Sequence, residues 1–228
     1  MQLKFKEVIP LEGDVKTFVF SPPDRVSWTP GQFIHFTLPH KDPDQRGDER
    51  WFTLSGAPFE GDVRITTRIN SEYSSSFKKA LLEMAPGDAI EADLPEGDFT
   101  VDDPSREYVF VAGGIGITPY HSILKQLDHD GKRIKAQLLY ANRDKAAVAF
   151  MKDLESYKEK NPDLTVTYFY ADHLIDEDAL RAAGAKMREP IYFVSGPEPM
   201  VEAFKTTLEK IGVDADHSKF DYFPGYDD

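Results

Sequence analysis

The residues whose types and spacing point most directly to chemistry form the stretch Arg50-Trp51-Phe52-Thr53-Leu54-Ser55. A permanent cation, aromatic rings and hydroxyl groups follow one another there on a predicted β-strand, in which side chains alternate between two faces. Such a set can hold a phosphate, a planar ring system and a ring nitrogen together. An ordinary barrel strand with one cation at its edge would carry the same residues, so the rest of the chain must decide between these two interpretations.

Two turns rich in glycine or proline each join a predicted strand to a predicted helix. They are Gly113-Gly114-Ile115-Gly116-Ile117-Thr118-Pro119, after the apolar run 108–112, and Ser195-Gly196-Pro197-Glu198-Pro199-Met200, after the apolar run 191–194. At such a turn, glycine lets the backbone come close to a diphosphate and the helix start supplies N–H donors. The spacing departs from the full dinucleotide-binding fingerprint, so a tight turn without a ligand remains an open alternative.

Three consecutive serines, Ser74, Ser75 and Ser76, precede a helical pattern carried by Phe77 and Leu81. The free N–H groups and the positive end of the dipole at a helix start favour an anion, and serine hydroxyls add donors. The serines therefore predict either a plain helix cap or a phosphate site that Arg50 completes from another strand.

Residues 1–98 form short segments of alternating apolar and polar side chains, separated by turn residues. Six such segments predict a six-stranded antiparallel β-barrel. They cover residues 3–8, 15–20, 32–38, 50–55, 63–68 and 89–94. The polar segment 39–49 has no periodicity, which predicts a loop that is either a mobile surface segment or a flap over a bound cofactor.

From about residue 106 the pattern changes to apolar runs that alternate with helical periodicity. This order predicts a doubly wound parallel sheet with helices on both faces. The predicted strands are 108–112, 134–141, 164–170 and 191–194, and the predicted helices are about 120–127, 147–160, 176–183 and 201–211. The segment 102–105 marks the boundary, which gives predicted domains of residues 1–103 and 104–228.

The composition excludes several classes of function. The 228 residues include no cysteine, which excludes disulfides, thiolate nucleophiles and metal sites held by cysteine. The net charge of −13 argues against nucleic-acid binding, because phosphate contacts need clustered cations. No apolar run approaches the roughly 20 residues that cross a bilayer, and the N-terminus lacks the apolar core of a signal peptide. No membrane partner is therefore expected, the cytoplasm is the default location, and the six scattered histidines predict no metal site.

Three motifs stand in an order and at distances that resemble the ferredoxin–NADP reductase superfamily. They are Arg50-x-Phe52-Thr53-x-Ser55, Gly113-Gly114-Ile115-Gly116-Ile117-Thr118-Pro119 and Ser195-Gly196-Pro197-x-x-Met200. The resemblance covers nearly the whole chain, including the order of a barrel before an α/β part. It implies an NAD(P)H-dependent flavoprotein reductase, in which a hydride passes from the nicotinamide to N5 of bound FAD and electrons then leave to a separate acceptor.

The resemblance also implies roles for the residues at matching positions. On the flavin side, cofactor binding is implied for Arg50, Trp51, Phe52, Thr53, Arg68, Ile69, Asn70, Ser74, Ser75, Ser76 and Phe223. On the nucleotide side, it is implied for Gly114, Gly116, Thr118, Asn142, Arg143, Gly196, Pro197 and Met200. A place near the hydride path is implied for Thr53, Ser195, Asp221 and Phe223. Since Phe52 and Thr53 point to opposite faces of a regular strand, contact of both with one ring requires the strand to end or twist there.

Two positions depart from the usual pattern of the superfamily. Ser195 stands where cysteine is frequent, and Asp221 stands where glutamate is common. Both departures bear on rates and on the choice of subfamily, and the implied reaction class is unchanged.

The sequence leaves the choice of cofactors and acceptor open. The resemblance favours FAD over FMN. Arg143 and Lys145 suit the 2′-phosphate of NADPH, whereas Asp144 suits the free ribose of NADH. The acceptor is expected to be a separate molecule, either a ferredoxin, a flavodoxin, a haem protein or free flavin, and the chain is expected to be a monomer. The alternative function is a non-catalytic flavin-binding module for regulation or electron transfer on the same fold.

Overall fold

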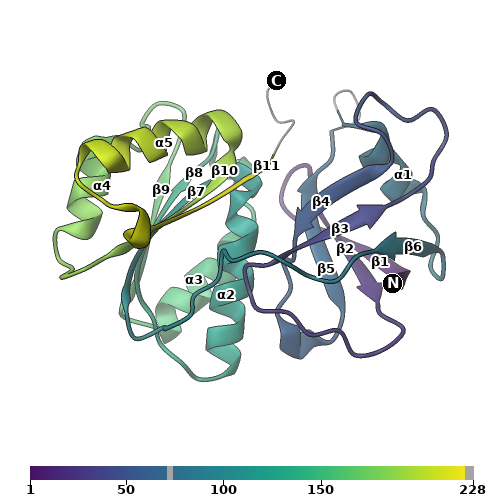
Figure 1. The fold of residues 1–228 in the computed structure, drawn as a ribbon, viewed down its shortest axis with the longest axis horizontal. Helices are drawn as coiled ribbons and strands as arrows, with labels where there is room; N and C mark the ends of the chain where they lie inside the picture. Colours follow the sequence, from purple (N-terminus) through teal and green to yellow (C-terminus); the bar gives the residue numbers. More distant parts are fainter. Residues whose placement is uncertain (71–73, 224–228) are drawn as a thin grey trace.

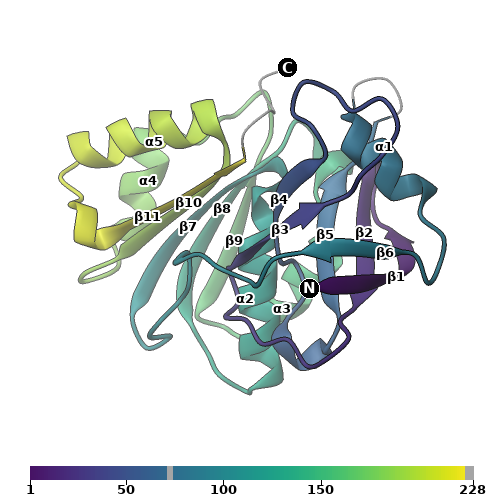
Figure 2. The ribbon, with the colours of Figure 1, turned by 45° about the vertical axis from the view of Figure 1, so that its right-hand side comes forward.

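The structure, a computed structural model, describes residues 1–70 and 74–223, with the side chain of Phe223 excepted. Two sheets lie side by side in it (Figure 1). The first is built by the N-terminal part of the chain, on the right in Figure 1, and the second by the C-terminal part, on the left. A turned view shows the last strand at an edge of the second sheet, with its C-terminal end pointing toward the barrel (Figure 2). The two sheets set the frame for the site between them.

The first sheet has six antiparallel strands within the described residues, in the order β4-β3-β6-β1-β2-β5. Their bounds are β1 Gln2–Pro10, β2 Val15–Ser21, β3 Phe33–Thr37, β4 Glu49–Thr53, β5 Val63–Arg68 and β6 Ala89–Ala92. A bridge between Leu54 and Ile65 joins the two outer strands, and the Ser55 N–H donates to the Arg64 carbonyl at 2.9 Å. The sheet thereby closes into the predicted barrel, which has no free long edge at this point.

The interior of the barrel is filled by the apolar side chains that alternate along its strands. The fully buried members include Phe18, Phe20, Ile34, Phe36 and Leu54. Helix α1, Ser76–Glu83, adds Phe77 and Leu81 to this core, which is why its apolar positions recur at helical spacing. Ser75 caps the helix by accepting from the Lys78 N–H at 3.3 Å.

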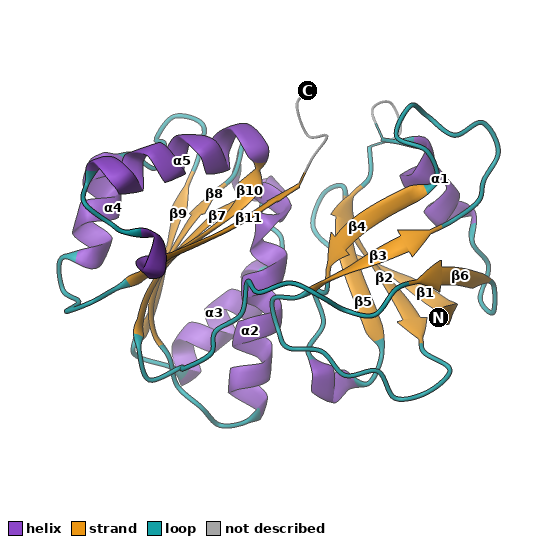
Figure 3. Ribbon diagram, in the orientation of Figure 1, coloured by secondary structure: helices purple, strands orange, loops and turns teal. Residues whose placement is uncertain are grey.

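The second sheet has five parallel strands in the order β11-β10-β7-β8-β9 over the part of the chain that the structure describes. Their bounds are β7 Glu107–Gly113, β8 Lys135–Ala141, β9 Leu164–Phe169, β10 Ile191–Pro197 and β11 Ser218–Phe223. Helices α2 Thr118–His129 and α3 Met151–Lys160 lie on one face, and α4 Glu177–Gly184 and α5 Glu198–Lys210 on the other (Figure 3). The predicted doubly wound α/β arrangement is confirmed.

Side chains of the central strand β7 show why both faces need helices. Tyr108 and Phe110 belong to the same buried cluster as Leu124 of α2, whereas Val109 and Val111 pack with residues of the opposite face. Every position from 108 to 112 is therefore buried, and the strand reads as a continuous apolar run.

The structure differs from the sequence-based expectations at one helix start and by one additional strand. Helix α3 begins at Met151 rather than near residue 147, because Lys145–Ala147 form a separate 3-10 turn and Phe150 adopts a left-handed backbone with φ 58°. Strand β11 was not predicted at all. It pairs in parallel with β10, which brings Asp221 opposite Ser195.

Helix α2 attaches the second sheet to the barrel through three side chains. His121 is buried and its Nδ1 lies 2.7 Å from the Ser55 carbonyl, while the Ser122 hydroxyl donates to the Gly56 carbonyl at 2.6 Å. Lys125 forms an ion pair with Glu60 at 2.9 Å. Since residues 55–60 directly follow β4, these contacts place the end of β4 against the parallel sheet.

The predicted division into residues 1–103 and 104–228 falls between β6 and β7. We propose it as the domain boundary, because a separate sheet with its own buried core lies on each side. Among the described residues, no helix combines the length and the apolar character that crossing a membrane requires.

Candidate functional site: a cleft between the two sheets

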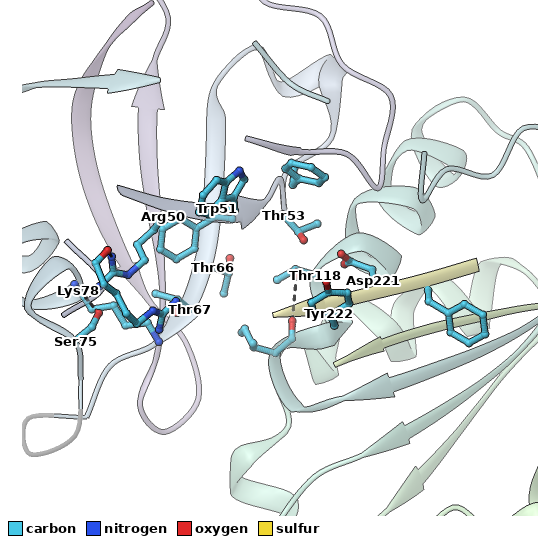
Figure 4. Close-up of a pocket in the computed structure, with 15 residues that line it drawn as sticks. Arg50, Trp51, Thr53, Thr66, Thr67, Ser75, Lys78, Thr118, Asp221 and Tyr222 are labelled. Atoms are coloured by element: carbon cyan, nitrogen blue, oxygen red, sulfur yellow. Dashed lines mark hydrogen bonds between the residues drawn. The ribbon is translucent and has the colours of Figure 1, made fainter. Parts of the chain in front are cut away.

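A cavity of about 380 Å³ lies between the barrel and the parallel sheet. This volume is in the range of small-molecule and cofactor sites. The barrel contributes Phe33, Arg46, Arg50, Trp51, Phe52, Thr53, Thr66, Thr67, Ser75 and Lys78 to its wall, and the second part contributes Ile115, Thr118, Phe220, Asp221 and Tyr222. Figure 4 shows Arg50, Ser75 and Lys78 at one end and Thr118, Asp221 and Tyr222 at the other. The cavity thus has a cationic end and an end formed by the parallel sheet.

Arg50 anchors the cationic end. Its side chain is nearly fully buried, and its guanidinium carbon lies 5.5 Å from the centre of the Phe77 ring. One terminal nitrogen donates to the carbonyls of Arg46, Gly47 and Glu49, and the other donates to Asp44 at 2.8 Å. Arg46 and Lys78 also line this end, so it is suited to an anionic group.

The barrel wall of the cavity is formed where β4 ends. The strand runs from Glu49 to Thr53, and both Phe52 and Thr53 line the cavity. Phe52 packs against Phe36 and Phe77, whereas Trp51 is 54% exposed and its ring lies 4.4 Å from that of His35. The end of the strand lets side chains from both faces reach one ligand, as the sequence required.

Thr53 supplies a polar group to this wall. Its side chain is buried, and its Oγ1 makes no hydrogen bond of standard geometry with the described residues, although it lies near enough to the Asp221 carboxyl to lower the pKa of that group. A buried hydroxyl without a well-formed hydrogen bond carries a free-energy cost, so such a group is a mark of a site that a ligand completes. The position and chemistry of Thr53 fit a hydrogen bond to a ring nitrogen.

Asp221 lines the opposite wall and pairs with Ser195, which does not itself line the cavity. They lie opposite each other in the parallel β10–β11 ladder, and the Ser195 hydroxyl donates to Asp221 Oδ2 at 3.2 Å. Burial raises the pKa of the Asp221 carboxyl to about 7, and it outweighs the opposite effects of the Ser195 and Thr53 hydroxyls. A carboxyl with this pKa can hold or release a proton near neutral pH.

The raised pKa of Asp221 predicts a pH-dependent stability. In the unfolded chain the group titrates near 4, and in the folded chain it titrates at about 7, so the folded protein binds the proton more tightly between these values. The free energy of unfolding should therefore fall as the pH rises from about 4 to about 7. Asp221→Asn, which cannot lose a proton, should lack this decline in urea unfolding measured across that range. The exposed Asp216 offers a matched control, and Asp216→Asn should keep the wild-type slope. Parallel curves for Asp221→Asn and the wild type would contradict the assignment.

The two glycine turns meet at the carboxyl edge of the parallel sheet. A Cβ on Gly116 would lie 2.2 Å from the Ser195 carbonyl oxygen, and Cβ atoms on Gly113 and Gly196 would each meet the Met200 side chain. The turns therefore pack backbone to backbone, and only glycine fits at residue 116. Thr118 follows this turn, lines the cavity and donates from its hydroxyl to the Ile115 carbonyl at 3.1 Å.

Several residues with a predicted role do not line this cavity. They are Arg68, Ile69, Asn70, Ser74, Ser76, Gly114, Gly116, Asn142, Arg143, Ser195, Gly196, Pro197 and Met200. Their roles stay predictions. The predicted role of the Phe223 side chain concerns atoms outside the described part of the structure, as does the segment Pro224-Gly225-Tyr226.

Arg68 joins the two parts of the molecule. It forms an ion pair with Asp14 at 2.8 Å, its NH2 group lies 3.5 Å from Asn142 Oδ1, and it also donates to the Ala147 carbonyl. Its side chain therefore crosses from β5 to the segment after β8. In that segment Arg143 is exposed and forms an ion pair with Asp144 at 3.0 Å.

Some residues that line the cavity were not predicted from the sequence, because they belong to no motif that indicates a binding role. Phe33, Arg46, Thr66, Thr67, Lys78 and Tyr222 belong to this set. Thr66 and Thr67 lie on β5, the strand that the Leu54–Ile65 bridge joins to the end of β4, and Tyr222 lies on the unpredicted strand β11. Barrel closure and the position of β11, which are both tertiary features, bring them to the cavity.

Comparison with known proteins finds similar oxidoreductases. Residues 110–206 match the family of oxidoreductase NAD-binding domains. The ferredoxin reductase component of the 3-ketosteroid-9-alpha-monooxygenase from Rhodococcus rhodochrous is 30% identical over 221 residues, which cover 92% of this chain. The chain is therefore similar to a ferredoxin reductase component and carries a match to an oxidoreductase NAD-binding domain. The resemblance seen in the sequence is confirmed.

The chain spans only part of these relatives. It covers 61% of the Rhodococcus protein and 57% of a flavohemoprotein from Candida albicans that is 30% identical and matches 94% of this chain. Solved structures of two reductases share the fold. The cytochrome P450 reductase of Amycolatopsis superposes with a TM-score of 0.80 at 19% identity, over 98% of this chain and 70% of that protein. Phthalate dioxygenase reductase superposes at 0.79 with 21% identity, over 100% of this chain and 69% of that protein.

Proposed function

We propose that the chain is a flavoprotein reductase that passes a hydride from NADPH or NADH to N5 of bound FAD and then electrons to a separate acceptor. The observation that carries the proposal is the shared cavity, in which Arg50, Phe52 and Thr53 of the barrel face Thr118 and Asp221 of the parallel sheet. A site between a barrel and the carboxyl edge of a parallel sheet can bring two ring systems together and exclude water from them.

The residues of the barrel would bind and orient the flavin. Arg50 and Ser75, at the cationic end, suit its diphosphate, and the aromatic side chains of Trp51 and Phe52 suit its ring system. Thr53 Oγ1 would supply a hydrogen bond to the N5 side of the ring. The backbone of Arg68, Ile69 and Asn70 and the hydroxyls of Ser74 and Ser76 are proposed as further contacts.

The residues of the parallel sheet would bind the pyridine nucleotide. Gly114, Gly116 and Thr118 form a strand-to-helix turn whose helix start favours a diphosphate. Gly196, Pro197 and Met200 form the second turn at the same edge of the sheet, beside it. Asn142 and Arg143 follow the adjacent strand β8 and are proposed for the adenosine half, where Arg143 suits NADPH and the paired Asp144 suits NADH.

Ser195 and Asp221 are proposed to hold a proton at the wall of the cavity. The Ser195 hydroxyl orients the carboxyl by its hydrogen bond to Oδ2, and the raised pKa keeps the carboxyl protonated for much of the time near neutral pH. Phe223 is proposed to approach the ring from the end of β11.

The proposed acceptor is a separate redox carrier, namely a ferredoxin, a flavodoxin, a haem protein or free flavin. The Rhodococcus relative is named as a ferredoxin reductase component, which supports a protein acceptor. A monomer in the cytoplasm is proposed as the working form.

The hydroxyl of Thr53, which makes no hydrogen bond of standard geometry with the described residues, gives a sharp expectation. Thr53→Val removes the hydroxyl and keeps the shape, so without cofactor its stability should equal or slightly exceed that of the wild type. The variant should bind FAD several-fold more weakly than the wild type, because one hydrogen bond of about 1 kcal/mol is lost. The FAD that it binds should be reduced by NAD(P)H more slowly. Thermal unfolding without FAD and titration with FAD measure the two effects. A clear loss of stability in the cofactor-free chain would show that Thr53 has a partner within the protein.

Reconstitution tests the proposed function itself. The purified full chain, incubated with FAD and freed of excess by gel filtration, should retain the flavin and show its visible absorbance. Steady-state assays with NADPH, NADH and a panel of acceptors should then give turnover with at least one pair. A chain that retains neither FAD nor FMN would refute the proposal. A chain that retains flavin but reacts with neither nucleotide would support the non-catalytic module instead.

A further inference from the structure

The segment 39–49, which the sequence left as a surface loop or a flap, is tied to the cationic end of the cavity by one side chain. Asp44 Oδ1 accepts from an Arg50 terminal nitrogen at 2.8 Å, and Asp44 Oδ2 accepts from the Ser76 N–H at 3.0 Å. Ser76 lies at the first position of α1. One carboxylate therefore joins the two groups that the sequence predicted for a phosphate, which come from different elements.

Further contacts of Ser76 strengthen this junction. Its hydroxyl accepts from the Asp44 N–H at 2.9 Å and lies 2.8 Å from His40 Nε2. The segment and the helix start thus exchange hydrogen bonds in both directions. Burial acts to raise the pKa of Asp44, but hydrogen bonds from the Arg46 and Ser76 N–H groups and from Arg50 outweigh it and hold the pKa at about 2. Asp44 is therefore charged at neutral pH.

The contacts of Arg50 show what this junction does. Its guanidinium is buried and is held on one side by Asp44 and by the carbonyls of Arg46, Gly47 and Glu49. Its Nε is buried without a partner among the described residues, and the residue lines the cavity beside Ser75. The protein fixes the position of this cation but leaves part of its hydrogen-bonding capacity unused, which is the arrangement expected of a preorganised anion site.

We propose that Asp44 is a positioning residue that locks Arg50, the start of α1 and the segment 39–49 into one phosphate-binding unit of the flavin site. The proposal deepens the proposed function and rests on it. Asp44 acts through Arg50 and does not contact the cofactor. The other interpretation, in which the Asp44 carboxylate competes with the phosphates for Arg50 and Ser76, predicts the opposite sign of effect and is an outcome of the test.

The test compares the affinity of the full chain for FAD and for riboflavin, which lacks phosphate. Asp44→Asn should weaken FAD binding about tenfold, since one charge-assisted contact that orients Arg50 is lost. Its affinity for riboflavin should not change. Asp42→Asn is the matched control, because Asp42 is an exposed carboxylate in the same segment. It should bind both ligands as the wild type does.

A double-mutant cycle with Arg50→Ala tests whether Asp44 acts through Arg50. If it does, Asp44→Asn causes no further loss of FAD affinity when Arg50 is already alanine. Equal losses for FAD and riboflavin would overturn the proposal, because they would reveal a general structural role. Unchanged or tighter FAD binding would also overturn it, and tighter binding would establish competition. Fully additive losses in the cycle would overturn it as well. If the wild type binds neither ligand, the proposed function fails, and that failure is distinct from these outcomes.

Discussion

Replacing Gly116 with alanine should separate the two turns at the carboxyl edge of the parallel sheet. The added Cβ would lie 2.2 Å from the Ser195 carbonyl oxygen and 2.7 Å from the Gly196 nitrogen, which are backbone atoms that cannot move aside alone. We expect the free energy of unfolding to fall by about 3 kcal/mol, as in severe overpacking. Reduction of bound FAD by NAD(P)H should be largely lost, because both turns proposed for the nucleotide shift. Urea unfolding and single-turnover reduction measure the two effects.

Gly113→Ala in the same turn is the control for this expectation. Its Cβ would meet the Met200 sulfur at 2.4 Å, but this sulfur belongs to a flexible side chain that can adopt another rotamer. The loss of stability should be clearly smaller, about 1 kcal/mol. FAD affinity should change little in either variant, since Arg50 and Ser75 belong to the barrel. Equal stabilities of Gly116→Ala and the wild type would contradict the packing described for the two turns.

Replacing Arg50 with alanine should weaken the binding of FAD about 100-fold, because the buried cation proposed for the diphosphate is removed. The change also leaves Asp44 and three loop carbonyls without their donor, so the cofactor-free chain should lose stability as well. Fluorescence titration of the flavin gives the affinity, and thermal unfolding without flavin gives the stability.

Arg50→Lys separates charge from geometry in this site. Lysine keeps the positive charge but cannot reproduce the fork that donates to Asp44 and to the carbonyls at once. Its FAD affinity should therefore lie between those of the wild type and of Arg50→Ala. If Arg50→Ala binds FAD as tightly as the wild type, Arg50 has no role in holding the diphosphate.

The sequence was sufficient for the parts of the site that local patterns determine. Apolar runs followed by glycine turns predicted the strands β7 and β10 and the sheet edge where their turns meet. The opposing directions of Phe52 and Thr53 predicted the end of β4, and the strand does end at Thr53. In each case the signal lies within a few neighbouring residues and follows from the geometry of one element.

Features that depend on distant contacts were not predictable in this way. Strand β11 has alternating polar and aromatic residues from Lys219 to Tyr222, a period-two signal that was present but short. The contact between Asp44 and Ser76 joins residues 32 positions apart and leaves no trace in a polar segment without periodicity. The burial of Arg50 is a further case, since backbone carbonyls and Asp44 that satisfy its donors come from the segment before β4 and from Glu49. All three features depend on tertiary contacts between segments that are distant in the sequence or belong to different elements.

Anaerobic stopped-flow mixing of the FAD-reconstituted full chain with NADPH, and separately with NADH, tests the central claim most directly. We expect the visible flavin absorbance to bleach in a fast phase with at least one nucleotide, at a rate that saturates with nucleotide concentration and lies in the range of typical enzyme turnover, about 1 to 1,000 per second. A flavin that stays oxidised with both nucleotides would contradict the claim that this cavity brings nicotinamide and flavin together.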